Sequence, residues 1–168
     1  DLKNIGVEVE TGEHSNRLLD SDIIIKSPGI SNDVEILKKL EQSNTQIVSE
    51  IEFAGMISNV NNICITGTNG KTTTVSLITK ILSEELNVLK SGNIGIPFSQ
   101  IVFEHKLYED NDIDYCILEL SSFQLEHCSH LKKEVSAFIN ISTDHMDRYD
   151  NFDDYFNTKL KVFDNSKY

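Results

Sequence analysis

The chain has 168 residues, of which 39% are hydrophobic and 25% are charged, a composition typical of a globular protein with one or two small domains. Its formal net charge of −12 argues against a nucleic acid or a membrane surface as a partner, because both are anionic. No signal peptide is recognisable, and no apolar run approaches the ~20 residues that span a bilayer. The three cysteines include no Cys-x-x-Cys pair, so we expect reduced thiols and a cytoplasmic location.

Residues 1–49 have the pattern of an incomplete α/β unit. Residues 22–26 contain three consecutive isoleucines, which predict a buried strand suited to parallel pairing. Asn32 and Glu35 have the spacing of a capping box, which predicts the start of a helix at this point. Around these features we expect a weakly alternating strand, a turn and a short final strand, at residues 5–9, 27–30 and 47–48.

The rest of the chain, residues 50–168, reads as further strands and helices. Apolar runs predict strands at residues 63–65, 115–118 and 135–141. Helices are expected at residues 50–58, 72–86, 123–127 and 155–163, and a glycine-rich loop at residues 91–97. This layout favours an open, mostly parallel sheet with helices on both faces. We therefore expect an α/β fold, in which a partial Rossmann-like unit (1–49) precedes a truncated P-loop-type domain (50–168).

The most informative stretch is the glycine loop, residues 67–70, which lies between an apolar strand and the Lys71-Thr72 pair. Glycines permit the tight turn that a strand-to-helix junction requires. The free N–H groups at the start of the following helix favour an anion above the turn. Lys71 adds a charge for a terminal phosphate, and the Thr72 hydroxyl can bind Mg²⁺. The stretch predicts a nucleotide triphosphate site made of Gly67, Thr68, Asn69, Gly70, Lys71, Thr72 and Thr73.

The glycine loop is shorter than the general phosphate-loop pattern, which has four residues between its glycines. Ile65 stands where the first glycine of that pattern would be. A strand-to-helix turn that binds nothing is therefore the alternative interpretation. The Gly-Lys-Thr sequence and its position between a strand and a helix favour nucleotide binding.

Polar residues also follow the two later strands of the predicted sheet. Glu119 and Ser121 come at the end of one strand, and Asn140, Asp144 and His145 come at the end of the other, with Asn140 in its last two residues. Ligands of open α/β sheets bind beyond the carboxyl ends of the strands, so these groups are expected near the triphosphate. A carboxylate and an imidazole there predict an Mg²⁺ shell with Glu119 as the oxygen donor. Helix capping by Glu119 and a surface position for His145 are the alternatives.

Taken together, these residues resemble the Mur ligases and their folylpolyglutamate synthase relatives. The glycine loop with its flanking threonines and Gly92-Asn93-Ile94-Gly95 are similar to the Mur pattern. The run from Glu119 to Glu126 and the run Asp144-His145-Met146-Asp147-Arg148-Tyr149 resemble the branch that adds D-glutamate. The Ser27-Pro28-Gly29-Ile30 turn fits the first domain of the same family.

The resemblance implies a role for several individual residues. Lys71 would stabilise the transferring phosphoryl group, as an electrostatic clamp does in phosphoryl transfer. Thr72 and Glu119 would hold one Mg²⁺, and His145 would act in catalysis by helping to hold a second. The implied substrate contacts are Ser27, Gly29, Asn93 and Ser121.

Lys159, four residues after Tyr155, matches the family lysine that carries a carbamate. Carbamylation converts a cation into an anionic oxygen ligand, so Lys159 would be both a catalytic residue and a metal ligand. Lys161 is the competing candidate. An exposed charge on a helix is the alternative for both lysines.

For the whole protein, the resemblance implies an ATP-dependent amide ligase of peptidoglycan precursor synthesis. ATP would phosphorylate the alanine carboxylate of UDP-N-acetylmuramoyl-L-alanine, and the amine of D-glutamate would displace the phosphate. We expect a monomer that uses ATP and Mg²⁺. A folylpolyglutamate synthase-like ligase and a nucleotide-binding module without ligation are the alternatives. The family's first strand and its C-terminal, D-glutamate-binding domain are missing, so we expect a fragment that does not ligate alone.

Overall fold

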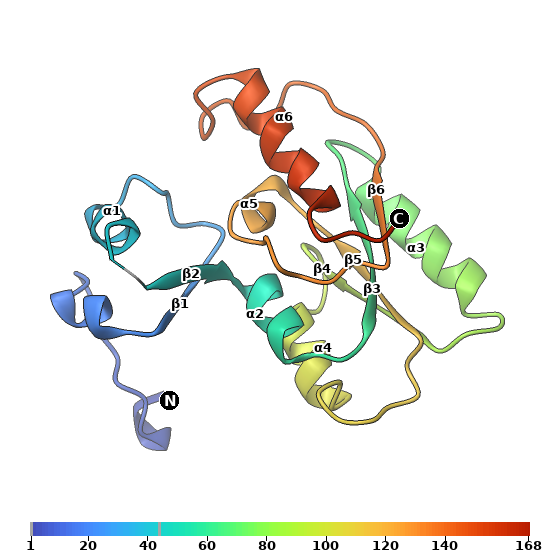
Figure 1. Ribbon diagram of the computed structural model, residues 1–168, viewed down its shortest axis with the longest axis horizontal. Coiled ribbons are helices and arrows are strands. Elements are labelled where there is room, and N and C mark those ends of the chain that lie inside the picture. The colour runs from blue at the N-terminus through green and yellow to red at the C-terminus, as the bar shows by residue number, and fades with distance from the viewer. Residues whose placement is uncertain (1, 44) are drawn as a thin grey trace.

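The computed structural model describes residues 2–43 and 45–168, and their strands form two separate parallel sheets (Figure 1). The smaller sheet pairs β1 (Ile23–Lys26) with β2 (Gln46–Ser49). The central sheet has the order β4-β5-β3-β6, and all its neighbouring strands are parallel. The predicted α/β fold with mostly parallel strands is confirmed.

The N-terminal unit, residues 2–49, consists of η1 (Leu2–Ile5), η2 (Asn16–Asp20), β1, α1 (Glu35–Glu41) and β2. Its apolar core lies between α1 and the inner face of the two strands, where Leu37 and Leu40 are buried. Each fully buried leucine contributes about 1.5–3 kcal/mol relative to an exposed one. The adjacent turn at residues 27–30 forms as predicted, with the Ile30 amide donating to the Ser27 carbonyl at 3.0 Å.

Three local expectations for the N-terminal unit are wrong. Residues 5–9 form no strand, because Gly6 has a φ of +83° and no described strand lies beside them to pair with. Strand β1 forms, but it is not buried on both faces, and Ile25 remains 49% exposed. Asn32 does not cap α1, because the helix begins at Glu35 with Val34 as its N-cap residue. The side-chain NH2 group of Asn32 donates to Glu126 instead, and its Oδ1 lies 3.3 Å from the His127 ring.

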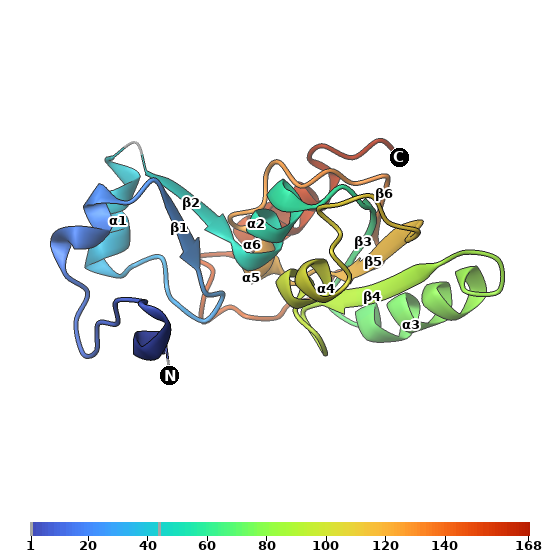
Figure 2. The same ribbon diagram turned by 90° about the horizontal axis from the view of Figure 1, so that it is seen from below.

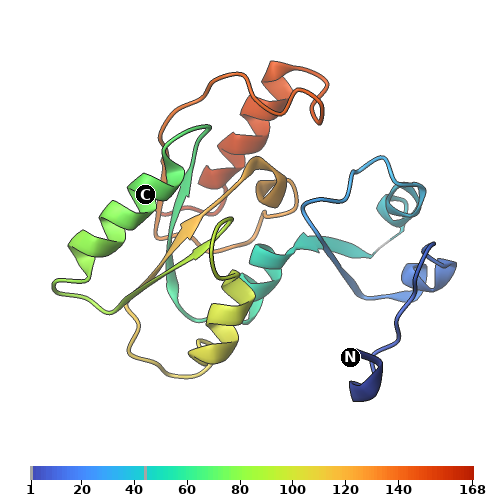
Figure 3. The same cartoon turned by 180° about the vertical axis from the view of Figure 1, so that it is seen from behind.

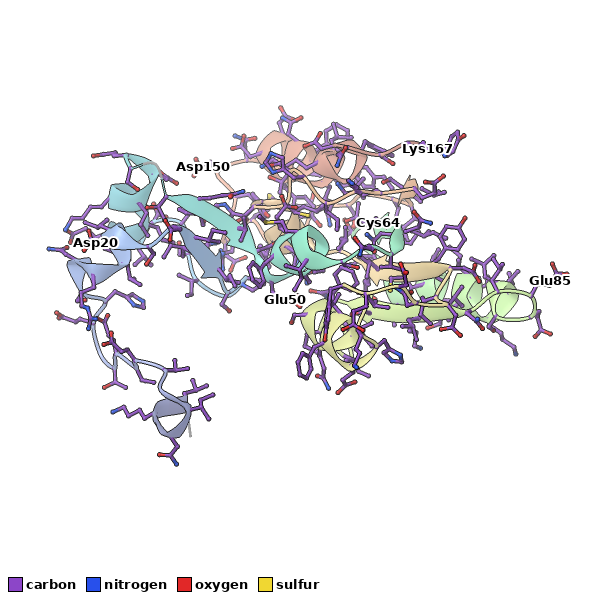
Figure 4. The ribbon with its side chains drawn as sticks, turned by 60° about the horizontal axis from the view of Figure 1, so that its bottom comes forward. Asp20, Glu50, Cys64, Glu85, Asp150 and Lys167 are labelled. Carbon is purple, nitrogen blue, oxygen red and sulfur yellow. The ribbon has the colours of Figure 1, made fainter. Side chains whose placement is uncertain are left out.

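The central sheet is built from β3 (Asn61–Thr66), β4 (Val88–Gly92), β5 (Tyr115–Glu119) and β6 (Val135–Phe138). Strand β3 lies between β5 and β6, so the glycine loop that follows β3 has a strand end on either side. The sequence prediction missed β4, whose last two residues were assigned to the glycine-rich loop. The chain passes from β2 directly into α2 at Glu50, which links the two sheets (Figures 3 and 4).

Helices cover both faces of the central sheet. Helix α3 (Lys71–Leu82) packs on Ile63, Ile65 and Ile117, and runs beside β4 at the end of the molecule far from α1 (Figure 2). The alternate residues Cys64, Cys116 and Leu118 face the opposite layer. Four elements contribute buried residues to this layer: α2 (Glu50–Ile57), α4 (Phe98–Glu104), α5 (Ser122–Leu125) and η3 (Lys161–Phe163). Helix α6 (Phe152–Leu160) directly precedes η3. The period-two alternation of a strand explains this division of side chains between the faces.

Candidate nucleotide and metal site

The glycine loop turns sharply between β3 and α3. Gly70 is the N-cap residue of α3 and has a left-handed backbone, with φ 79° and ψ 2°. A Cβ on Gly67 would lie 2.6 Å from Cγ1 of Ile139 and 3.2 Å from the Asn140 carbonyl oxygen. Glycine is therefore needed at Gly67 for the close packing of the loop on the chain after β6, and at Gly70 for its conformation.

The His145 loop, residues 140–151, fixes the conformation of the glycine loop. The Asn140 side chain accepts a hydrogen bond from the Asn69 amide at 3.0 Å and donates to the Asn69 carbonyl at 2.8 Å. The Thr68 amide donates to the Asn140 carbonyl at 3.1 Å, and the Ser142 amide donates to the Thr68 hydroxyl at 3.1 Å. These bonds preorganise the loop next to the α3 N-terminus, where helix amides attract an anion.

Two lysines meet at the glycine loop. The Lys71 ammonium donates to the carbonyls of Gly67 at 3.0 Å and Thr68 at 2.9 Å. Lys159, from α6, donates to the same Gly67 carbonyl at 2.8 Å, and its side chain is buried. Lys161 instead donates to the Glu126 carbonyl. Lys159 therefore contacts the glycine loop, whereas Lys161 contacts the backbone that follows α5.

Burial lowers the pKa of Lys159 to about 8, and the nearby charge of Lys71 acts in the same direction. The Asp144 carboxylate opposes the shift. The Lys159 ammonium lies 4.8 Å from the centre of the Tyr155 ring. A lysine with this pKa has an appreciable neutral fraction near neutral pH, and the neutral amine is the form that reacts with CO₂.

Glu119 and Thr72 form the candidate metal site. The Thr72 hydroxyl donates to Oε2 of Glu119 at 2.8 Å. Glu119 is 3% exposed, and its Oε1 has no hydrogen-bond partner among the described residues. Because an unpaired buried carboxylate oxygen is costly, this atom suits a cation. No group of three or more acidic, histidine or cysteine side chains gathers among the described residues. Mg²⁺ typically needs only one or two carboxylates besides phosphate and water, so this donor set fits it.

Gly92 brings the next loop against Glu119. A Cβ on Gly92 would lie 2.1 Å from the Glu119 carbonyl oxygen, so only glycine allows β4 to approach this closely. The Asn93 amide then donates to the same oxygen at 2.8 Å. Asn93, which is exposed, therefore lies with its backbone against the end of the strand that carries Glu119.

Aromatic contacts connect His145 to the glycine loop by way of Tyr155. Its ring is 4.9 Å from the Phe123 ring and 6.1 Å from the Tyr155 ring, measured between centroids. Tyr155 in turn has its hydroxyl 3.1 Å from the Thr68 hydroxyl of the glycine loop. The backbone of His145 is left-handed, with φ 55°, and its Nε2 is 3.6 Å from Oδ2 of Asp144.

Two of the expected substrate contacts, Ser27 and Gly29, lie in the exposed turn after β1. Arg148 of the His145 loop donates to the Pro28 and Ile30 carbonyls, each at 3.4 Å. The loop leading to Asp150 extends over the side occupied by the N-terminal unit (Figure 4). The turn is therefore held close to the loop that carries His145.

Ser121, the fourth of the expected substrate contacts, has a structural role. It is the N-cap residue of α5 in a capping box with Gln124. Its hydroxyl accepts from the Gln124 amide at 3.3 Å and lies 3.0 Å from Oε1 of that side chain. A substrate contact from this hydroxyl would have to share it with the helix cap.

Sequence reasoning missed three residues of this site. Gly92 was used only as part of a glycine-rich loop and of the family pattern and was given no role of its own, Ser142 was not singled out, and Tyr155 was used only to locate Lys159. The spacing of Tyr155 and Lys159, four residues apart on a helix, is a signal that would have placed both on one face. The contacts of Gly92 and Ser142 join segments far apart in the chain and leave no local pattern.

A strand, a glycine loop and a helix opening with Lys-Thr, with a buried glutamate on the neighbouring strand, define an α/β protein with a P-loop-type strand–loop–helix unit. Residues 65–168 match the family model described as Mur ligase middle domain. The chain therefore belongs to the Mur ligase family, and the resemblance drawn from its motifs is confirmed.

Curated relatives agree with this assignment. The chain is 43% identical over 167 residues to a UDP-N-acetylmuramoylalanine--D-glutamate ligase of Bacteroides fragilis, and 39% identical over 171 residues to one of Chloroherpeton thalassium. Each match covers 98% of this chain and 36% of the relative, so the chain spans about a third of their length.

A solved structure has the same fold. It is the UDP-N-acetylmuramate:L-alanyl-gamma-D-glutamyl-meso-diaminopimelate ligase from Neisseria meningitides, with a TM-score of 0.53 and 14% identity. The match covers 98% of this chain and 56% of that one. Among the described residues, no helix combines the length and apolarity needed to cross a membrane.

Proposed function

We propose that the complete protein is an ATP-dependent amide ligase that joins D-glutamate to UDP-N-acetylmuramoyl-L-alanine in peptidoglycan precursor synthesis. The observation that carries the proposal is the convergence of Lys71, Lys159 and the Thr72–Glu119 pair at one glycine loop. The named activity of the curated relatives supports the choice of substrates. The proposal includes a monomer acting in the cytoplasm.

The two units of the chain would bind different substrates. Residues 1–49 would belong to the domain that binds the uridine-linked substrate, with Ser27 and Gly29 at its edge. Residues 50–168 would form the ATP-binding domain, with Asn93 and Ser121 contacting the substrate where it approaches the γ-phosphate. This division is consistent with the separate apolar clusters of the N-terminal unit and the central sheet.

Bound Mg-ATP would supply the phosphoryl group that activates the alanine carboxylate. The amides of the glycine loop and of the α3 N-terminus would bind the β- and γ-phosphates. Lys71 would exchange its two loop carbonyls for the phosphoryl oxygens and stabilise charge in the transition state. Thr72 and Glu119 would hold the metal ion, and His145 would hold a second one.

Lys159 would act after reaction with CO₂. The neutral amine adds to CO₂ and releases one proton, which gives an anionic carbamate. The ammonium now donates to the Gly67 carbonyl, whereas the carbamate would present oxygens toward the same region. Its negative charge would offset the charge of a metal ion and of Lys71.

The experiment is an amide-ligation assay on the complete protein. We expect phosphate release and amide formation to require both D-glutamate and the uridine-linked substrate. Lys71→Ala should lower turnover by about 10²-fold or more, the usual loss when one transition-state donor is removed. Activity only with a folate and glutamate, or unchanged turnover in the variant, would contradict the proposal.

A further inference from the structure

The junction between the N-terminal unit and the central sheet is polar. The apolar core of the N-terminal unit and the core beneath the central sheet are separate clusters. The connections between them run instead through Glu126 and His127 after α5 and through the His145 loop. The Ser49 amide donates to the His127 carbonyl at 2.9 Å, and the His127 ring lies 3.3 Å from Oδ1 of Asn32.

The Glu126 carboxylate is the centre of this junction. Its Oε2 accepts a hydrogen bond from Asn32 at 3.0 Å and lies 3.6 Å from the ammonium of Lys26. Its Oε1 accepts from the Tyr149 hydroxyl at 2.9 Å. The side chains of Lys26 and Glu126 are only 2% and 11% exposed. One carboxylate therefore joins β1, the turn region after it and the His145 loop.

Arg148 forms a second connection between the same two segments. Besides its bonds to the Pro28 and Ile30 carbonyls, its guanidinium lies 4.6 Å over the Phe123 ring. The turn that carries Ser27 is thus held from both sides. Lys26 precedes it on β1 and Asn32 follows it, and both contact Glu126.

We propose that Glu126 is a positioning residue that fixes the Ser27 turn, residues 27–30, relative to the His145 loop. The identity of the molecule bound at the turn, the uridine-linked substrate, rests on the function proposed above. The carboxylate does not touch the reacting atoms. It sets the distance between the segment that would hold the substrate and the loop that would hold metal.

In this proposal, the buried Lys26–Glu126 pair fixes the relative position of two segments and contributes little to the free energy of unfolding. Apolar side chains can often replace a buried ion pair without loss of stability, whereas removal of one partner leaves the other charge buried and unpaired. Glu126→Gln keeps the volume of the side chain but leaves Lys26 without its carboxylate. Lys26→Met combined with Glu126→Met removes both charges and with them the directed bonds to Asn32 and Tyr149.

The test uses the complete protein with steady-state kinetics and amide hydrogen exchange. We expect Glu126→Gln to raise KM for the uridine-linked substrate by about tenfold, the scale of one hydrogen bond to a charged group, without changing KM for ATP. Exchange should become faster in residues 27–32 and 145–149 together. The double Met variant should regain thermal stability but keep the raised KM.

Glu35→Gln is the matched control. It removes the partner of Lys39 at 2.8 Å in the same N-terminal unit, but this pair is exposed, so neither KM nor the exchange of the two segments should change. Unchanged exchange and KM in Glu126→Gln would overturn the proposal. A KM that returns to the unsubstituted value together with stability in the double variant would also overturn it. Failure of the unsubstituted protein to ligate D-glutamate would instead remove the proposed function, while the exchange of the two segments would still test Glu126.

Discussion

Replacing Gly92 with alanine tests whether the end of β4 controls the position of Glu119. A Cβ at this position would lie 2.1 Å from the Glu119 carbonyl oxygen, whereas ordinary contact begins at 3.4 Å. The two backbones would therefore have to separate by about 1.3 Å. A displacement of ~1 Å in an active site can cost about 10²-fold in rate. The φ of +121° adds a strain of about 1–3 kcal/mol for alanine.

We expect Gly92→Ala to lower kcat/KM of the complete protein by about 10²-fold and to weaken Mg²⁺-dependent ATP binding. Gly95→Ala is the matched control, because Gly95 also has a positive φ, +89°, but no atom lies within 4 Å of its Cβ position. In urea denaturation, Gly95→Ala should have a lower free energy of unfolding because of the backbone strain. Its Mg²⁺-dependent ATP binding should stay unchanged. Equal stability and equal Mg²⁺-dependent binding in the two variants would refute this reasoning.

Two further predictions concern Lys159 and Asn140. Because burial lowers the pKa of Lys159 to about 8, the folded chain binds fewer protons than the unfolded chain between about pH 8 and 10. Stability of the unsubstituted protein should therefore rise relative to Lys159→Met over this range, and parallel denaturation curves at all pH values would contradict the burial argument. Asn140→Asp removes the donor to the Asn69 carbonyl and should weaken ATP binding by about 10- to 100-fold in a fluorescent-nucleotide titration. Asn111→Asp is its control, because Asn111 makes the same two kinds of bond in an exposed loop, to Glu109 and Ile113, and an equal effect there would contradict a specific role.

Local sequence was sufficient to predict the glycine loop and its surroundings. An apolar strand, two glycines and Lys71-Thr72 occupy one continuous stretch, so propensity, turn chemistry and charge all act within a few residues. The position of Glu119 next to this loop could be predicted for a similar reason, since it directly follows a buried run and strand ends share one edge of a parallel sheet.

What the sequence did not reveal depends on contacts between distant segments. Asn32 fits a capping box locally, but its side chain contacts Glu126 and His127, which lie 94 and 95 residues away in the chain. The run at residues 5–9 has a weak strand pattern, yet a strand needs a hydrogen-bonded neighbour and Gly6 turns the chain away. Strand β4 was not predicted because glycine at its end is typical of a loop. Gly92 is required there for another reason, which is its close packing on the Glu119 backbone.

In the proposed site, one loop binds the triphosphate while Glu119 and Thr72 hold its metal ion. The most direct measurement is a crystal structure of the complete protein with Mg²⁺ and a non-hydrolysable ATP analogue. We expect the β- and γ-phosphates to lie against the amides of residues 68–72, and the ion to lie within about 2.1 Å of oxygens of Thr72 and Glu119. Phosphates bound elsewhere, or an ion that Glu119 does not contact, would contradict this proposal.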